Sequence, residues 1–365
     1  MKKARIAVAG CGWWTQGWHL PHLARNPDAE ICALIEPSKV LQSTLNPDIE
    51  QIGKLAERYS VPAFDSVDEM LADVGPENID GVLVASTHAT HFDISSKALK
   101  AGVNVFCEKP MCTDPEEARV LAAIAEDCGL LFMVNNTANW RENTIRATEI
   151  VQRGGGGLGD VEHVNCYMGS PLLWLFDDPA NVGWVKPTGT MTGNGFGWGQ
   201  LSHTLSWVFQ VTGLIPKSVF AHMHFSKRSG ADLYDSATIL CSNGATVSVQ
   251  GVATLPGKNP VASKQITNQV FGSEGFIEYS GDDQDPSSGS LLLRRHDGST
   301  ETHGSFLFEN YEQEGIGPES LCAFVDGCRG DSNVWNGCNA EIGLRTVVTI
   351  DAMYKSATTG LAVEV

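Results

Sequence analysis

The first 137 residues alternate between short apolar runs and longer amphipathic stretches. The apolar runs cover residues 5–9, 30–35, 81–86, 104–107 and 130–135. Helix-like segments lie between them, over residues 49–60, from Ser66 and from Asp114, and the last two start with capping residues. Short buried strands that alternate with amphipathic helices predict a parallel sheet with helices on both faces. We therefore expect a doubly wound α/β domain of the Rossmann type over residues 1–137.

The pattern changes after about residue 140. A helix is expected over about 141–153, and strand-like runs follow over 161–168, 217–225, 236–242, 245–253, 263–272, 275–280 and 290–295. The tetrapeptides SNGA and GSEG between some of these runs predict hairpin turns, and residues 281–290 read as a loop. We expect an α+β domain over 138–365 with a large, open, mostly antiparallel sheet. Its closing helix, over 338–357, is a candidate to pack back on the first domain.

Composition and charge narrow the class of protein. The 365 residues are 42% hydrophobic and 19% charged, which is typical of a globular enzyme, and the net charge of -18 disfavours nucleic acid and anionic membranes as partners. No apolar run approaches twenty residues, and the apolar stretch near the start is too short for a signal peptide, so we expect a cytoplasmic protein. The ten cysteines are scattered without a C-x-x-C pair, which predicts reduced thiols and no metal site.

A glycine turn follows the first predicted strand. Gly10 and Gly12 stand between that strand and a helix, and Glu36 ends the next strand 26 positions after Gly10. Such a turn holds a pyrophosphate at a helix N-terminus, and the acidic residue binds the ribose hydroxyls. Glu36 would repel a 2′-phosphate, so the sequence favours NAD over NADP, although Lys39 nearby tempers that preference.

The segment Glu108-Lys109-Pro110 comes directly after the strand at 104–107. It therefore lies at the carboxyl end of the sheet, where open α/β sheets bind ligands. With the glycine turn, the segment from Thr87 to His91 and the glycine-rich stretch before His203, the chain resembles the glucose-fructose oxidoreductase/inositol dehydrogenase (Gfo/Idh/MocA) family over nearly its whole length. The most specific element of the resemblance is AGVNVFCEKP, residues 101–110.

The resemblance implies hydride transfer between a nicotinamide and a substrate carbon, with Lys109 and His203 as catalytic residues. The candidate cofactor-binding residues, from the resemblance and from the turn itself, are Gly10, Gly12, Trp13, Trp14, Thr15, Glu36, Thr87, His88, His91, Glu108 and Lys109. Aromatic and amide side chains near His203 suit a polyhydroxylated ring. The candidate substrate residues are Asn139, Lys186, Asn194, Trp198 and Gln200.

The chain departs from the family pattern at three places. His88 stands where the family has proline, and Gly199 stands where it has an aspartate four residues before the histidine. Without that carboxylate, Lys109 and His203 would carry all the acid–base work. His19 lies nine positions after Gly10 instead of eight, which we interpret as a one-residue insertion that gives Thr15-Gln16 a longer turn.

The substrate class implied by the resemblance is a sugar, a cyclitol or a glycoside, with glycoside 3-oxidation as one specific form. Two alternatives stay open. One is a dihydrodiol or other non-sugar carbonyl reductase, and the other is a non-catalytic regulator that senses NAD and sugar. The open sheet of the second domain leaves a large face to cover, and the resemblance implies a homo-oligomer.

Overall fold

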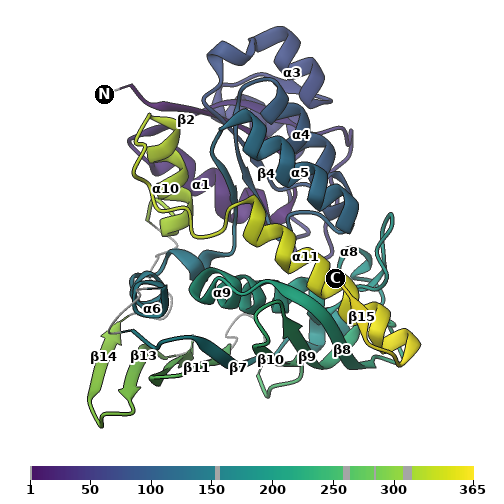
Figure 1. The fold of residues 1–365 in the computed structure, drawn as a ribbon. Helices are drawn as coiled ribbons and strands as arrows, with labels where there is room; N and C mark the ends of the chain where they lie inside the picture. The colour runs from purple at the N-terminus through teal and green to yellow at the C-terminus, as the bar shows by residue number, and fades with distance from the viewer. Residues whose placement is uncertain (1, 153–156, 258–263, 283–284, 307–314) are drawn as a thin grey trace. The chain divides into compact units, whose positions relative to one another are not determined.

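The computed structural model describes residues 2–152, 157–257, 264–282, 285–306 and 315–365. Its contacts divide the chain into two compact units: Met1–Thr137 with Tyr311–Leu344, and Ala138–Asn310 with Arg345–Val365 (Figure 1). Residues 311–344 thus group with the first unit, although the sequence pattern assigned them to the second domain, over 138–365. The domain limits of 1–137 and 138–365 stay a prediction. No helix of the described ranges is long and apolar enough to cross a membrane.

The first unit is built on a six-stranded parallel sheet with the order β3-β2-β1-β4-β5-β6. The strands are β1 (Ala4–Ala9), β2 (Ala29–Ile35), β3 (Ala63–Phe64), β4 (Gly81–Val84), β5 (Asn104–Cys107) and β6 (Phe132–Val134). The helices are α1 (Leu20–Arg25), α2 (Ile52–Tyr59), α3 (Val67–Val74), α4 (His91–Lys100), α5 (Pro115–Cys128) and α10 (Glu319–Cys328). The predicted doubly wound parallel sheet is confirmed.

Local sequence explains where two of these helices begin. The Ser66 side chain accepts a hydrogen bond from the Glu69 N–H at the start of α3. The Asp114 side chain accepts bonds from two backbone N–H groups at the start of α5, where Pro115 takes the first helical position. Helix α10 was not predicted in this unit. Its Phe324 lies 5.3 Å from Phe106 of β5, between ring centroids, so this late segment covers the core of the first sheet.

The second unit contains a nine-stranded sheet with the order β14-β13-β12-β11-β7-β10-β9-β8-β15. Its strands are β7 (Val161–Gly169), β8 (Pro216–Phe225), β9 (Asp232–Cys241), β10 (Thr246–Val252), β11 (Gln265–Gly272), β12 (Gly275–Asp282), β13 (Asp285–Arg295), β14 (Thr300–Phe306) and β15 (Val363–Glu364). Among the described strands of this second sheet, the β7–β10 pair is parallel and the other pairs are antiparallel, so the predicted mostly antiparallel sheet is confirmed.

The loop predicted over residues 281–290 was wrong. β12 continues to Asp282 and β13 already begins at Asp285, with these two residues paired across the ladder. The polar composition of the segment suggested a loop, but cross-strand pairing next to Ser280 and Ser290 extends both strands. Tertiary pairing therefore overrides local propensity here.

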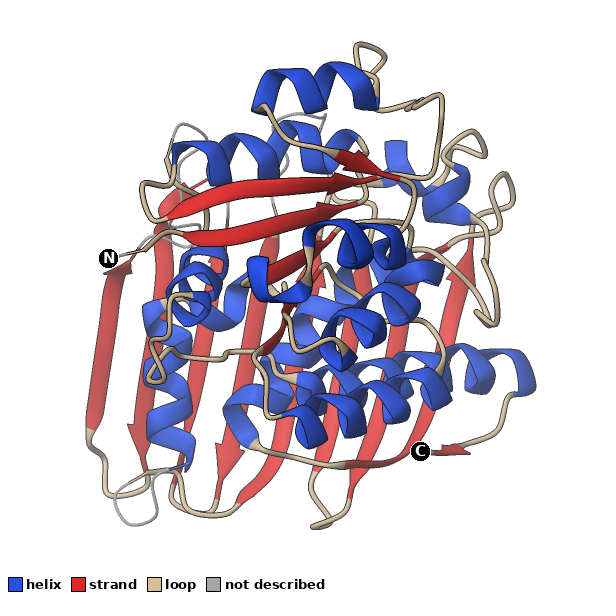
Figure 2. Cartoon of the chain, turned by 90° about the horizontal axis from the view of Figure 1, so that it is seen from above, coloured by secondary structure: helices blue, strands red, loops and turns tan. Residues whose placement is uncertain are grey.

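Helices cover one face of this sheet. α6 (Glu142–Gln152) and α9 (Ser202–Thr212) pack on each other, and α9 packs on β7 (Figure 2). The described part also holds two one-turn helices, α7 (Leu173–Phe176) and α8 (Val182–Val185), and α11 (Ala340–Thr359), whose residues fall in both units.

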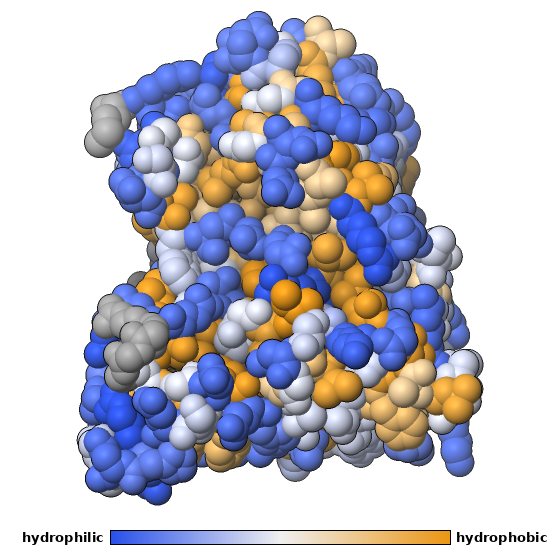
Figure 3. Space-filling view, viewed as in Figure 1, coloured by the Kyte–Doolittle hydropathy of each residue, from blue (hydrophilic) through white to orange (hydrophobic). Residues whose placement is uncertain are grey.

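One edge strand of the sheet is short, and the surface at the other edge is hydrophilic. β15 is only two residues long, and the end of the sheet with β13 and β14 is covered by hydrophilic residues (Figure 3). Short and charged edge strands resist edge-to-edge association. An oligomer built on this sheet is therefore expected to use its face.

The face that includes Phe220, Tyr234 and Leu240 exposes large apolar side chains. These three are 39%, 44% and 39% exposed, and they lie on the same side of the β8–β9 pair. We predict that a second copy of the chain covers this face. Leu240→Glu should then lower the molar mass in solution, because a charge would be buried at the interface.

Light scattering coupled to size exclusion measures this effect. Val120→Glu is the matched control, since Val120 is 47% exposed on α5 of the other unit, and it should leave the molar mass unchanged. A wild-type protein with the mass of one chain, 39.2 kDa, would contradict the prediction.

Candidate active site

The carboxyl ends of four strands meet at one edge of the first sheet. Ala9, Val84, Cys107 and Val134 are paired in register across β1, β4, β5 and β6. The residues that follow three of these strands, Gly10, Glu108 and Asn135, therefore come together at this edge. Ligands of open α/β sheets bind in this place.

Gly10 makes the first turn at this edge. Its φ of 88° lies in the left-handed region, and a Cβ on it would fall 2.5 Å from the backbone of Ser86. Only glycine fits such a position. A Cβ on Gly12, by contrast, would meet no atom within 4 Å, which leaves its backbone open to a ligand.

The extra residue inferred between Gly10 and His19 lies inside a helix. The helix widens into a π turn, η1 (Thr15–His19), closed by a hydrogen bond from the Leu20 N–H to the Thr15 carbonyl. The expected longer turn at Thr15-Gln16 was therefore wrong, because a π turn holds one more residue than an α turn. The Thr15 hydroxyl instead donates to the Gly10 carbonyl at 2.7 Å and fastens the helix to the glycine turn.

Gln16 connects the glycine turn to the loop after β2. Its Nε2 donates to the carbonyls of Cys11 (2.8 Å) and Glu50 (2.9 Å), and its Oε1 accepts from the Glu50 N–H (2.9 Å). The Glu36 carboxylate joins the same turn, since it accepts from the backbone N–H groups of Cys11 and Ser38, both at 2.9 Å. The predicted phosphate and ribose elements are therefore held together by direct hydrogen bonds.

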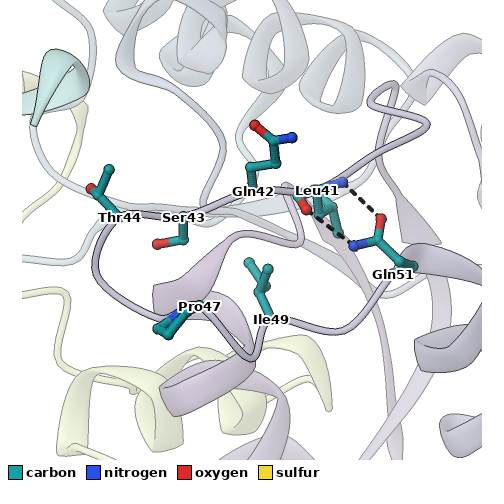
Figure 4. Close-up of a pocket in the computed structure, with 7 residues that line it drawn as sticks. All are labelled: Leu41, Gln42, Ser43, Thr44, Pro47, Ile49 and Gln51. Carbon is teal, nitrogen blue, oxygen red and sulfur yellow. Dashed lines mark hydrogen bonds between the residues drawn. The ribbon is translucent and has the colours of Figure 1, made fainter. Parts of the chain in front are cut away.

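The loop after Glu36 forms a pocket of about 450 Å³ that sequence reasoning missed. It is lined by Leu41, Gln42, Ser43, Thr44, Pro47, Ile49 and Gln51 (Figure 4). The Gln51 side chain closes the loop through two hydrogen bonds with the backbone of Leu41. Because the adenosine end of a dinucleotide lies beyond the second strand, this pocket is a candidate for the adenine. No glycine fingerprint or charge pattern marked it in the sequence.

Glu108 connects three segments at the sheet edge. Its Oε1 accepts hydrogen bonds from His19 Nε2 (2.8 Å), Asn135 Nδ2 (2.8 Å) and Trp14 Nε1 (3.2 Å). Burial acts to raise the pKa of this carboxyl, but the hydrogen bond from His19, the charges of His19 and Lys109, and the Asn135 amide lower that pKa to about 2. Glu108 is therefore an ionised acceptor near neutral pH.

His91 positions the turn that carries the predicted catalytic lysine. It is fully buried, and its two ring nitrogens lie 2.8 Å from the Pro110 carbonyl and 3.1 Å from the Ser86 carbonyl. The Lys109–Pro110 peptide is cis, and Lys109 is half-buried. The pKa of the neighbouring His88 falls to about 3, first through burial and then through His91 and Lys109, so His88 is neutral near pH 7.

These groups fit NAD. The open glycine turn at a helix start can receive the pyrophosphate, and the buried Glu36 carboxylate can meet the ribose. Thr87 is exposed at the start of the short helix η3 (His88–Thr90), which follows β4 at the same edge. The roles of the individual residues stay predictions.

Three of the predicted residues of the second unit, Trp198, Gln200 and His203, lie on one helical segment. The π turn η5 (Gly197–Leu201) leads directly into α9. Between residues 194 and 209 every residue is buried except Gln200 and His203. Gln200 lies in the π turn and His203 lies three residues later in the first turn of α9, so an amide and an imidazole are the half-buried polar side chains of this segment.

Aromatic rings lie where the missing aspartate would be. A Cβ on Gly199 would fall 2.9 Å from Cζ of Phe176 and 3.8 Å from Cζ3 of Trp184. Any side chain at position 199 would therefore have to displace the Phe176 ring. The absence of the aspartate is thus matched by packing of the Phe176 ring.

A buried pair of carboxyls underlies this helix and was not found from sequence. Asp232 accepts from the Gly197 N–H (2.6 Å) and from the Tyr354 hydroxyl (2.5 Å). Asp235 lies beside Asp232 with both of its oxygens buried, and no donor of the described residues reaches them apart from the carboxyl pair itself. Burial and the neighbouring Asp232 raise the pKa of Asp235, which favours its protonated form.

The remaining substrate candidates are buried or bonded to the backbone of their own unit. The Asn194 amide donates to the carbonyls of Gly183 (3.2 Å) and Lys186 (3.0 Å), and Lys186 Nζ donates to the Ser229 carbonyl (2.7 Å). Trp198 is fully buried and stacks on Tyr354, with ring centroids 6.2 Å apart. Asn139 is also fully buried, on η4 (Thr137–Trp140). Their substrate roles stay predictions, and the geometry favours Gln200 over them.

Comparison with known proteins identifies the class of protein. The profile described as "Oxidoreductase family, NAD-binding Rossmann fold" matches residues 4–136, and that of the Gfo/Idh/MocA C-terminal domain matches residues 145–278. The chain therefore belongs to the Gfo/Idh/MocA family, as the sequence motifs predicted. It is an NAD(P)-dependent oxidoreductase whose first unit carries the NAD-binding fold.

Similar proteins show the range of the family. The scyllo-inositol 2-dehydrogenase (NADP(+)) IolW of Bacillus subtilis is 24% identical over 77% of this chain and 70% of its own length. The D-glucoside 3-dehydrogenase of Escherichia coli is 28% identical, but over only 43% of this chain and 41% of that protein. The crystal structure of GenD2 from gentamicin A biosynthesis, in complex with NAD, is similar to this structure with a TM-score of 0.71 and 21% sequence identity. The match covers 100% of this chain and 97% of the GenD2 chain.

The Glu108 carboxylate should make the free energy of unfolding depend on pH in the acidic range. Its folded pKa of about 2 lies below the ordinary 4.5, so its contribution is complete above pH 4.5 and is lost as the pH falls toward 2. The gap in free energy of unfolding between wild type and Glu108→Gln should shrink by about 2 kcal/mol from pH 7 to pH 3, at 1.36 kcal/mol per pKa unit.

Urea unfolding at the two pH values measures this gap. Glu116→Gln, which removes an exposed carboxylate on α5, is the control and should show no comparable change. If the free energies of unfolding of wild type and Glu108→Gln differ by the same amount at pH 7 and pH 3, the carboxylate does not have the lowered pKa described here.

Gly199→Ala should destabilise the protein by about 1–3 kcal/mol, because its methyl group would push against the Phe176 ring. Gly183→Ala is the matched control, since a Cβ on Gly183 of α8 meets nothing within 4 Å. That control should be neutral or more stable by up to about 1 kcal/mol. Chemical denaturation distinguishes the two, and equal effects would refute the packing argument.

Proposed function

We propose that the protein transfers a hydride between NAD and a ring carbon that bears a hydroxyl or ketone in a sugar, a cyclitol or a glycoside. The observation that carries this proposal is the pairing of Gln200 and His203 as the only residues not buried between positions 194 and 209. An amide and an imidazole three residues apart suit a ring with several hydroxyls. Membership of the family supports the reaction class.

Bound NAD supplies the hydride acceptor. In the oxidative direction, Lys109 must first lose its own proton; its amine then takes the proton of the substrate hydroxyl while the hydride leaves the carbon that bears this hydroxyl. His203 shares or relays that proton, and Gln200 orients a hydroxyl through its amide. On this proposal Lys109 and His203 carry the acid–base chemistry, and no carboxylate stands at position 199.

Glycoside 3-oxidation is the specific form that we favour. The partial similarity to a D-glucoside 3-dehydrogenase supports it. The half-buried Trp184 ring near Gly199 also supports it, since an aglycone adds apolar area to the substrate. The similarity to an inositol dehydrogenase keeps cyclitols in the same proposal.

Two other functions remain distinguishable by assay. A dihydrodiol or non-sugar carbonyl reductase would act on hydrophobic diols or ketones and not on sugars. A non-catalytic NAD- and sugar-sensing regulator would bind both ligands without turnover. The presence of both Lys109 and His203 favours an enzyme over the regulator.

A panel of free sugars, inositols, glycosides and hydrophobic diols, assayed for NADH formation, tests the proposal. Turnover is expected with at least one polyhydroxylated ring. Lys109→Met should abolish that turnover and leave NAD affinity largely intact, because it removes the base without altering the glycine turn.

Lys100→Met is the matched control, since Lys100 is an exposed lysine at the end of α4. It should keep full turnover. The proposal fails if no polyhydroxylated compound in the panel is oxidised, and the role of Lys109 fails if Lys109→Met retains near-normal turnover.

A further inference from the structure

Trp14 is an exposed aromatic residue held in a fixed orientation. The residue is 38% exposed, although it lies directly before the π turn and reaches Glu108 at the carboxyl edge of the first sheet. One contact is with Trp18, whose ring is nearly parallel at a centroid distance of 5.3 Å and an angle of 18°. The Trp13 ring meets the Trp14 ring edge-on, with ring centroids 5.5 Å apart. The Trp14 Nε1 donates a hydrogen bond to the Glu108 carboxylate at 3.2 Å. Three neighbours thus fix a ring that still faces solvent.

The location of Trp14 restricts which ligand it can contact. It follows Gly12 of the phosphate turn by two residues, and its indole nitrogen reaches Glu108, the residue directly before Lys109. A dinucleotide must extend from the turn to the reacting lysine. Its nicotinamide end therefore passes the Trp14 ring. This step rests on the proposed role of Lys109.

We propose that the Trp14 indole stacks on the nicotinamide ring of NAD and binds the oxidised, cationic form more tightly than the reduced form. A pyridinium cation over an indole face gains a cation–π attraction that the neutral dihydropyridine lacks. The hydrogen bond from Nε1 to the Glu108 carboxylate enriches the indole in electrons and strengthens this attraction. Trp18 supports the ring from one side, so little side-chain entropy is lost on binding.

The π turn gives this arrangement its structural basis. An extra residue in the helix allows Trp14 and His19, five positions apart, to reach the same oxygen of Glu108. An α-helical spacing places residues four apart on one side. We infer that the insertion at the glycine turn serves to position Trp14.

Titration of the purified full-length protein with NAD⁺ and with NADH, without substrate, tests the proposal. Calorimetry gives both dissociation constants, and the difference absorption spectrum reports a long-wavelength charge-transfer band of a stacked indole and pyridinium. Trp14→Leu should weaken NAD⁺ binding about ten-fold and NADH binding much less, since a cation–π contact contributes roughly 0.5–2 kcal/mol. The absorption band should disappear.

Two further variants keep the result decisive. Trp174→Leu removes a similarly exposed tryptophan of the second unit and should change neither constant. Trp14→Phe keeps an aromatic ring, but one of lower electron density. It should therefore weaken NAD⁺ binding less than Trp14→Leu does and should leave NADH binding unchanged. This variant replaces Trp14→Leu in the test if Trp14→Leu does not fold. Equal weakening of both cofactor forms, or unchanged constants with the band retained, would overturn the proposal.

The outcome is independent of the substrate assay. A protein that shows the band and the NAD⁺ preference but oxidises no compound of the panel would contradict the proposed function and leave Trp14 stacking intact. A protein that oxidises glycosides while Trp14→Leu binds both cofactor forms as wild type does would refute only the stacking.

Discussion

The ionised carboxylate of Glu108 is the interaction on which the cofactor edge depends. One oxygen accepts hydrogen bonds from Trp14, directly before the π turn, from His19 at the end of that turn, and from Asn135 directly after β6. Three segments from distant parts of the sequence thereby meet directly before Lys109. A buried carboxylate needs this many donors, because burial alone would favour its neutral form. The same contacts that satisfy Glu108 therefore fix the surroundings of the proposed catalytic lysine.

Much of the fold could be predicted because it depends on local patterns. Alternation of short buried strands with capped helices indicates a parallel sheet, and the starts at Ser66 and Asp114 follow from capping chemistry. The segment at 281–290 failed because its strand pairing is decided by neighbours across the sheet. Helix α10 could not be assigned to the first unit, since nothing local in residues 319–328 records that Phe324 packs on Phe106.

The candidate site divides in the same way. Glycine spacing, Glu36 and Glu108-Lys109-Pro110 were visible as motifs, since their chemistry demands fixed residue types at fixed distances along the chain. The pocket after Glu36 was not visible, because the loop over residues 41–51 that forms it carries no recognisable motif. The pair of Asp232 and Asp235 was not visible either, because its partners Gly197 and Tyr354 are distant in the sequence. Two of the three departures from the family pattern are explained by the structure: a π turn lies where the extra residue was inferred, and Gly199 leaves room for the Phe176 ring.

The central claim is that a hydride passes from a substrate ring carbon to the nicotinamide. The most direct measurement uses a glycoside that carries deuterium on the ring carbon that is oxidised, followed by mass spectrometry of the reduced cofactor. The account predicts one deuterium atom in the nicotinamide ring of each NADH formed by the wild-type protein. Reduced cofactor without deuterium, or oxidised glycoside without reduced cofactor, would contradict it.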